Sequence, residues 1–281
     1  MKKIPFIFLL IFFSQRAFAQ YDTIYSNDER IACSVKEVTP DAVKFSYPNE
    51  DLVNSVYKNT IQKIVFKSGR VQIFAESTYF KTVNSVEDFD NVSLSHVAGE
   101  VQGLYKIGEV GAKARGTTAL ANMEKVKERA EMKIKIQAAM MGANIVYLTQ
   151  FATSDNRLGN RYNVGQATAT NISGVAYSNK LPSFDGFENL INAKSKLNFI
   201  YNEVDKLGSG DYECTRFTDT GAVIINRIYN DNGFIMIDAS ITGFDNKTFR
   251  VISYNTDGFI LECIDNSDIT ENSIYNVRVR L

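Results

Sequence analysis

Two pairs of acidic residues, each two positions apart, are the first candidates for chemistry in this chain. Asp88 and Asp90 form one pair, and Glu203 and Asp205 form the other. Many glycosidases place two carboxyl groups on opposite sides of a cleft for acid–base work. Two acids on one segment are also a common pattern of a solvated surface. A hydrolytic site would therefore require acids from different parts of the chain to converge in a cleft.

The single histidine, His96, stands in "SLSHVAGE" beside Ser93 and Ser95. A Ser–His–Asp arrangement is formally open, but neither serine lies in the G-x-S-x-G pattern of an activated nucleophile. We interpret His96 as a surface or half-buried residue at the end of a strand. No catalytic residue is predicted.

One histidine and three scattered cysteines do not make the cluster that a zinc site requires. The "NDNG" and "NTDG" stretches lack the full spacing of a calcium loop and are typical of hairpin turns. "GAKARGTT" at 111–118 has the glycine spacing of a phosphate loop, but Thr117 occupies the position of the loop's lysine. No metal and no cofactor is predicted.

The cysteines raise the question of a disulfide. Cys33 alternates with Ile31 and Val35, which is typical of a buried small side chain. Cys214 and Cys263 lie in the same C-terminal region and could pair, although connectivity cannot be read from sequence.

Residues 1–19 have the three parts of a secretory signal peptide. Two lysines precede an apolar run at 4–13, and "AFA" at 17–19 supplies the small residues that a signal peptidase requires. The run is shorter than the ~20 residues needed to span a membrane. We expect cleavage before Gln20 and export to the periplasm or the exterior of a bacterium. No cysteine follows the run, so a lipoprotein is not expected.

The charge of the mature chain is mild. Without residues 1–19 the chain loses three of its 31 basic residues and none of its 32 acidic ones, so the net charge is about -4. This balance does not indicate the basic surface that nucleic-acid binding requires. No second apolar stretch is long enough to span a membrane, so we expect no transmembrane segment after cleavage.

The chain is predicted to be an α+β protein of three small modules, the first at residues 20–83. Alternating apolar residues, a "TPDA" turn at 39–42 and two strands around Ser68-Gly69 indicate four or five short strands with little helix. Strands this short suggest a strongly bent sheet or open barrel related to SH3 and Sm folds.

Residues 91–179 are predicted to place one long helix on an antiparallel sheet. Thr117 or Thr118 is the expected N-cap. Apolar residues at steps of three and four form one face of the helix, and they are Leu120, Met123, Val126, Ala130, Ile134, Ala138 and Met141. Gly142 should end the helix in a left-handed conformation, and small Ala143 lets the strand from Asn144 begin close to it. We interpret this joint as packing geometry, not as a chemical site.

This "AAMMGAN" joint, its apolar strand and a later "GVAY" strand resemble the YbjQ-like domains. They also resemble the related C-terminal domain of the Rcs envelope-stress sensor lipoprotein, where "QAAxLGANAV" has the same helix–glycine–strand form. The resemblance covers residues 100–177. It implies a compact α+β unit with a helix on one face of an antiparallel sheet, and a role in binding and assembly.

Residues 183–281 are predicted to be a helix followed by an antiparallel meander of about six strands. "FENLINAKSKLNFIYNEVDKLGSG" has apolar residues at helical spacing as far as Leu207. "FTDTGAVI", "YNDNGFIM" and "YNTDGFIL" carry the polar residue and glycine of hairpin turns. Turns are expected near Thr220, Asn232, Asp245-Asn246 and Asp257.

These observations favour an exported, non-enzymatic cell-envelope protein that binds or assembles. Its partner could be an envelope protein, or a small amphiphile held between the C-terminal helix and the meander. Homo-oligomer formation is left open. The alternative is a secreted hydrolase with an unrecognised carboxylate pair or serine site.

Overall fold

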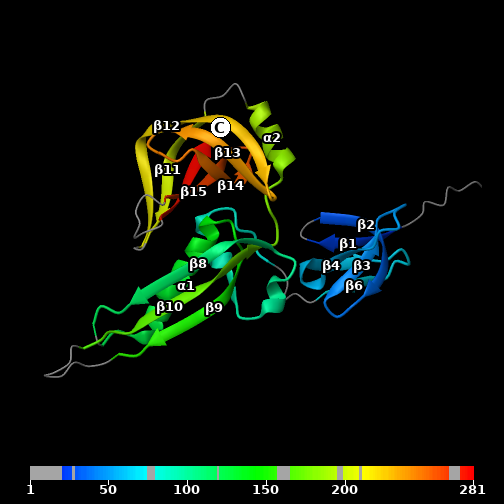
Figure 1. The fold of residues 1–281 in the computed structure, drawn as a ribbon, viewed down its shortest axis with the longest axis horizontal. Coiled ribbons are helices and arrows are strands. Elements are labelled where there is room, and N and C mark those ends of the chain that lie inside the picture. Colours follow the sequence, from blue (N-terminus) through cyan, green and yellow to red (C-terminus); the bar gives the residue numbers. More distant parts are fainter. Residues whose placement is uncertain are drawn as a thin grey trace, which may run out of the picture. The chain divides into compact units, whose positions relative to one another are not determined.

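The structure is a computed structural model that describes residues 21–26, 29–74, 80–118, 120–156, 165–194, 199–208, 211–265 and 273–281. The signal peptide predicted at residues 1–19 lies outside these described residues. The chain forms two compact units that divide after Glu76, and each is described by itself (Figure 1). The second unit holds both of the regions that the sequence predicted as the middle and C-terminal modules.

The first unit is a six-stranded antiparallel sheet in the order β4-β3-β2-β1-β5-β6. Four or five strands were predicted here. Ile24, Cys33, Val43, Ile61 and Ile64 are fully buried in its core. The strands are β1 (Asp22–Ser26), β2 (Glu29–Val38), β3 (Ala42–Ser46), β4 (Asn54–Tyr57), β5 (Ile61–Val65) and β6 (Val71–Ile73), with the short helix η3 (Lys58–Thr60) before β5.

The second unit begins with a helix on a four-stranded sheet. Strands β8 (Tyr105–Arg115) and β9 (Ile145–Ser154) both pair antiparallel with β10 (Ala169–Ser178). The short β7 (Ser93–Ser95) joins the edge of β9 in parallel. Helix α1 (Met123–Met140) packs against this sheet together with the short helix η5 (Val86–Asn91), and η6 (Ala98–Val101) precedes β8. The fold is therefore α+β, with mostly antiparallel sheets and one long helix.

The buried stripe of α1 follows the predicted spacing from Val126 to Met141. The helix begins later than predicted, because Asn122 and not Thr117 or Thr118 is the N-cap; its side chain accepts the Lys125 N–H at 3.1 Å. Leu120 precedes the helix and is 82% exposed. Within the described part of the chain, no helix is long and apolar enough to cross a membrane.

The second unit ends in a closed barrel of six strands. Helix α2 (Phe184–Ala193) contributes Phe187 to the barrel core, where its ring centroid lies 5.3 Å from that of Phe259. The predicted meander therefore closes on itself, because the first and last strands pair. The strands are β11 (Phe199–Leu207), β12 (Tyr212–Asp231), β13 (Phe234–Ile241), β14 (Thr248–Asn255), β15 (Gly258–Asp265) and β16 (Ser273–Arg280).

Two predictions for this region were wrong. The helix predicted as far as Leu207 ends at Ala193, and residues 199–207 form β11. A strand is stable here because β12 and β16 pair with its two sides, and such non-local pairing overrides helical spacing. The turn expected near Thr220 is instead an irregularity within β12, where the residues that pair with β11 jump from Arg216 to Gly221.

Helix α1 lies between its sheet and the outer surface of the barrel (Figure 1). Leu207 of β11 and Ile274 of β16 are buried in the same core cluster as the helix. Lys133 of α1 also forms an ion pair with Asp211 at 2.8 Å. The sheet, the helix and the barrel wall therefore form successive layers of one unit.

Candidate functional site

The joint after α1 has the geometry predicted for it. Gly142 has φ +72°, a left-handed conformation that glycine adopts without a Cβ clash. The Gly142 N–H donates to Ala139 O and the Ala143 N–H donates to Ala138 O, both at 2.9 Å. This pair of bonds is the Schellman motif. Asn144 then enters the sheet, with its N–H donating to Tyr177 O at 3.0 Å.

The barrel covers this joint. A Cβ added to Gly142 would lie 2.9 Å from Cγ2 of Ile252 on β14. The Arg250 guanidinium, also on β14, donates to Met141 O at 3.0 Å and so caps the end of the helix. The joint is therefore a docking point between two layers of the same unit.

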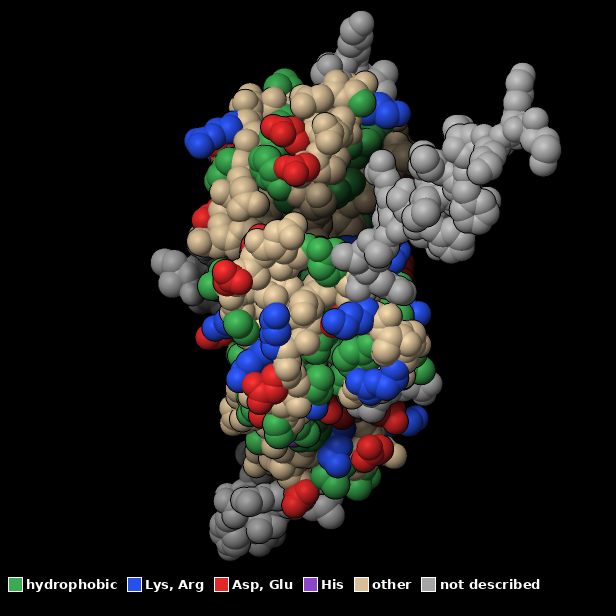
Figure 2. Space-filling model, turned by 90° about the vertical axis from the view of Figure 1, so that its right-hand side faces the viewer, with side chains coloured by type: hydrophobic (Ala, Val, Ile, Leu, Met, Phe, Trp, Pro, Cys, Tyr) green, Lys and Arg blue, Asp and Glu red, His purple; other side chains and the backbone are tan. Residues whose placement is uncertain are grey.

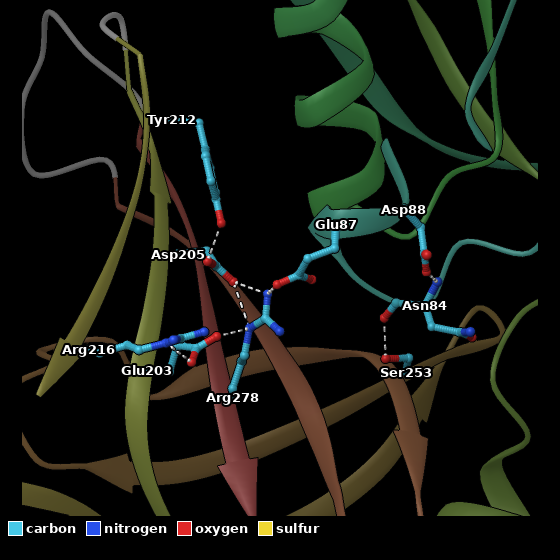
Figure 3. A network of polar contacts seen from close by, with 9 residues as sticks. All are labelled: Asn84, Glu87, Asp88, Glu203, Asp205, Tyr212, Arg216, Ser253 and Arg278. Atoms are coloured by element: carbon cyan, nitrogen blue, oxygen red, sulfur yellow. Dashed lines mark hydrogen bonds and ion pairs between the residues drawn. The ribbon is translucent and has the colours of Figure 1, made fainter. Parts of the chain in front are cut away.

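A second contact between the layers is a cluster of charged side chains on the outer wall of the barrel. Glu203 and Asp205 lie on β11 and are 5% and 0% exposed. The strand register places Arg278 of β16 opposite Glu203, and Cys214 of β12 opposite Asp205. Arg216 of β12 lies on the other side of Glu203. Figure 3 shows how Glu203, Asp205, Arg216 and Arg278 converge.

Each of the four carboxylate oxygens of Glu203 and Asp205 lies in a hydrogen bond or an ion pair with a donor in the protein (Figure 3). Glu203 binds Arg216 Nε at 2.7 Å and Arg278 Nε at 2.9 Å. Asp205 accepts the Tyr212 hydroxyl at 2.6 Å and Arg278 at 3.0 Å. Burial and the neighbouring Asp205 carboxylate raise the pKa of Tyr212, so its hydroxyl stays a donor.

Helix η5 contributes the third carboxylate of the cluster. Glu87 binds the same Arg278 guanidinium. Partial burial raises the pKa of Glu87, but hydrogen bonds from Ser85, from its own backbone and from Arg278 outweigh this effect, so the pKa lies below its ordinary value. Ser253 of β14 also donates to Asn84 O at 2.5 Å beside the cluster. Arg278 thus joins the helical layer to the barrel wall.

The cluster suits a structural role better than a metal or catalytic one. The ligand atoms of Glu203, Asp205 and Cys214 lie within 4.8 Å of one another, a spacing that one metal ion could bridge. A cation there would have to displace the guanidinium groups of Arg216 and Arg278. A general acid–base pair also needs a carboxylate oxygen that faces its substrate, whereas these oxygens face protein donors.

The disulfide considered between Cys214 and Cys263 is absent from the structure, in which all three cysteines are thiols. Cys214 is exposed on the outside of β12, whereas Cys263 is buried in the barrel core. Cys33 is buried, as predicted, and burial raises its pKa to about 11. Burial also raises the pKa of Cys214, with further contributions from Asp205.

Alkylation of the native chain without reductant should modify Cys214 first. A thiol must be exposed and deprotonated to react, so labelling of Cys214 should accelerate at mildly alkaline pH. Cys33 and Cys263 should be labelled only after denaturation. Mass spectrometry of peptides reports each site, and a Cys214 that is protected in native chain but released by reductant would show that a disulfide forms.

A row of polar groups extends from the cluster across the barrel wall. Asn276 of β16 lies opposite Asp205 on one side and Glu262 on the other. Asn276 is 1% exposed, and neither polar atom of its side chain has a hydrogen-bond partner among the described protein atoms. Glu262 binds Arg250 through one oxygen at 2.7 Å. Burial raises the pKa of Glu262, although Arg250 opposes the shift.

Substitution Asn276→Leu should therefore stabilise the second unit. It removes a buried amide without partners at similar volume, and leaving such a group unsatisfied costs about 1–3 kcal/mol. Chemical denaturation should show a gain of roughly 1–2 kcal/mol. The matched variant Asn276→Asp adds a charge between two carboxylates and should destabilise. A loss of stability in Asn276→Leu would mean that the amide makes a favourable interaction.

The other residues considered for catalysis, Asp88, Asp90 and His96, do not take part in this cluster. Asp88 accepts the Asn84 N–H at 2.9 Å and is half-buried, and Asp90 is exposed. Their helix η5 does approach the Glu203 and Asp205 pair, but through Glu87. His96 is exposed, and no hydrogen bond joins it to Ser95 in the described contacts, where Ser95 Oγ accepts the Val97 N–H at 3.0 Å.

Sequence reasoning did not find Glu87, Tyr212, Arg216 or Arg278. The Glu203-x-Asp205 spacing places both carboxylates on one face of a strand, but this segment was predicted to be helical. A strand prediction would have directed both acids away from the barrel core and toward a basic neighbour. The alternating Arg278 and Arg280 of the last strand are the signal that could have suggested that partner.

Comparison of the chain with protein-family models, with curated proteins and with solved structures gives no significant match.

Proposed function

We propose that this chain is an exported protein of the bacterial cell envelope that acts by binding or assembly and not by catalysis. The observation that carries the proposal is the engagement of all four oxygens of Glu203 and Asp205 by protein donors. These were the acids most suited to a hydrolytic pair. Through Arg278, which also binds Glu87, they instead connect two layers of one unit.

The surface supports a binding role, and its mixed charges do not favour nucleic acid as the partner. The face drawn in Figure 2 intersperses acidic, basic and hydrophobic side chains. Exposed apolar residues occur close together in the first unit: Leu52 and its neighbour Val53 are 68% and 55% exposed, and Val71 and Ile73 of β6 are 51% and 75% exposed. Exposed apolar groups that are more than scattered single residues favour contact with another molecule.

We also propose that residues 100–177 have a YbjQ-like fold. Helix α1, the left-handed Gly142 and the antiparallel strands β9 and β10 support this assignment. The barrel contacts the joint at Ile252, so assembly through the joint is disfavoured. The binding surface of this protein is then elsewhere, on the first unit or on the exposed side of the barrel.

The test uses the full chain expressed in a bacterium with its own signal. Export predicts that the periplasmic or secreted form begins at Gln20, which intact mass spectrometry measures. Chemical cross-linking in intact cells should give a discrete adduct that the Glu203→Gln variant retains. A hydrolytic activity on ester or glycoside substrates that Glu203→Gln abolishes, with the thermal transition unchanged, would overturn the proposal, as would an uncleaved cytoplasmic chain.

A further inference from the structure

Strand β4 forms one edge of the six-stranded sheet in the first unit. Among the described residues, no strand pairs with its outer side. Apolar side chains gather at this edge, where Leu52, Val53 and Tyr57 are 68%, 55% and 44% exposed. Free edges present unpaired N–H and C=O groups, and proteins usually protect them with charge, bulges or cover. An apolar edge is therefore suited to adding another strand.

The backbone of β4 is oriented for such an addition. The Lys58 N–H donates to Asp41 O at 2.9 Å across the pair with β3. Hydrogen-bonded and non-hydrogen-bonded pairs alternate along an antiparallel ladder. The even-numbered residues of β4 therefore bond toward β3, whereas Ser55 and the Tyr57 N–H face the free side. The Tyr57 C=O accepts the Thr60 hydroxyl at 2.8 Å.

We propose that a second copy of this chain pairs with β4 in antiparallel orientation about a two-fold axis. Such an axis is normal to the sheet, so the core-facing sides of the two copies lie on the same side of the joined sheet. Directly opposite residues must then point to the same face. The axis therefore passes between one residue and the same residue of the second copy, and we call this residue the centre. A centre at Asn54 places Leu52 opposite Val56 twice over. It also brings Glu50, in the turn before β4, near Lys58 at the start of η3, again twice over. A centre one residue away would instead place Leu52 opposite Lys58, or Glu50 opposite Val56.

The register centred on Asn54 is also consistent with the packing of the unit. In this register Ser55 exchanges backbone hydrogen bonds with Val53 of the second copy. The Leu52 and Val56 pairs are then of the non-hydrogen-bonded kind, in which side chains approach most closely. Val56 already packs against the core of the first unit, so these pairs extend that core across the edge. The inference rests on this edge alone and stands apart from the proposed function.

The first test is the mass of the mature chain (20–281) by light scattering over a concentration series. A concentration-dependent dimer is expected. Glu50→Lys and Lys58→Glu each replace two attractive pairs by repulsive ones, so each should weaken the dimer by about tenfold or more. An equal mixture of the two variants should dimerise again, because opposite charges then face each other at both ends.

Ser55→Pro is a second test, because it removes a backbone donor from the free side and leaves the bonds to β3. It should abolish the dimer with an unchanged circular dichroism spectrum. Lys67→Glu, an exposed charge reversal between β5 and β6, is the matched control and should have no effect. A chain that is monomeric at every concentration, or a dimer indifferent to Ser55→Pro, overturns the proposal and leaves the edge to a different partner.

Discussion

Replacing Arg278 by alanine should lower the free energy of unfolding of the second unit by about 3–5 kcal/mol, the cost of leaving a buried charge without its partner. Asp205 is fully buried and Arg278 is its guanidinium partner in the cluster. Without it, that carboxylate would still accept from the Tyr212 hydroxyl and the Cys214 thiol, but both of these donors are neutral. Glu87 would lose the same partner, so the contact between η5 and the barrel should loosen too.

Hydrogen exchange at the amides of β11 and β16 measures this loss in the second unit alone. The matched control is Lys127→Ala, which removes an exposed ion pair with Glu124 at 3.5 Å and should cost roughly 0–1 kcal/mol. The pair Arg278→Met and Asp205→Asn should recover part of the stability, because no buried charge then remains unpaired at that position. Equal losses in Arg278→Ala and Lys127→Ala would contradict a clamping role for the cluster.

Gly142→Ala is expected to destabilise the second unit by about 2–5 kcal/mol. The left-handed backbone costs an L-residue about 1–2 kcal/mol, and forcing a methyl into a filled space costs about 1–3 kcal/mol more. The new Cβ would lie 2.9 Å from Ile252 Cγ2. Both the helix end and the barrel wall would have to shift to accept it.

Denaturant unfolding can separate the two causes. Gly233→Ala is the matched control, since its φ is +92° and its nearest neighbour is the end of the flexible Leu181 side chain at 3.3 Å. It should show the backbone cost with little clash. In an Ile252→Ala background, Gly142→Ala should cost no more than that control. If the cost is the same in both backgrounds, the contact with Ile252 is not responsible.

The charged cluster and the Gly142 joint show why the contact between the helical layer and the barrel wall could not be predicted from the sequence. Glu87 and Arg278 are separated by 191 positions in the chain, and nothing near either residue indicates the other. Cys214 and Cys263 lie in the same C-terminal region, yet strand register places Cys214 outside the barrel and Cys263 inside it. Register depends on which strands pair, and such pairing is a property of the closed sheet.

The sequence by itself determined the local features. The helical stripe from Val126 to Ile134, the left-handed stop at Gly142 and the hairpin turns at Asn232 and Asp257 follow from side-chain period and backbone freedom over a few residues. Only the tertiary structure decided that residues 199–207 form a strand, that the meander closes, and that the acid pair is clamped by arginines. Each of these depends on partners distant in the chain, and their contacts outweigh local preference only when the layers have come together.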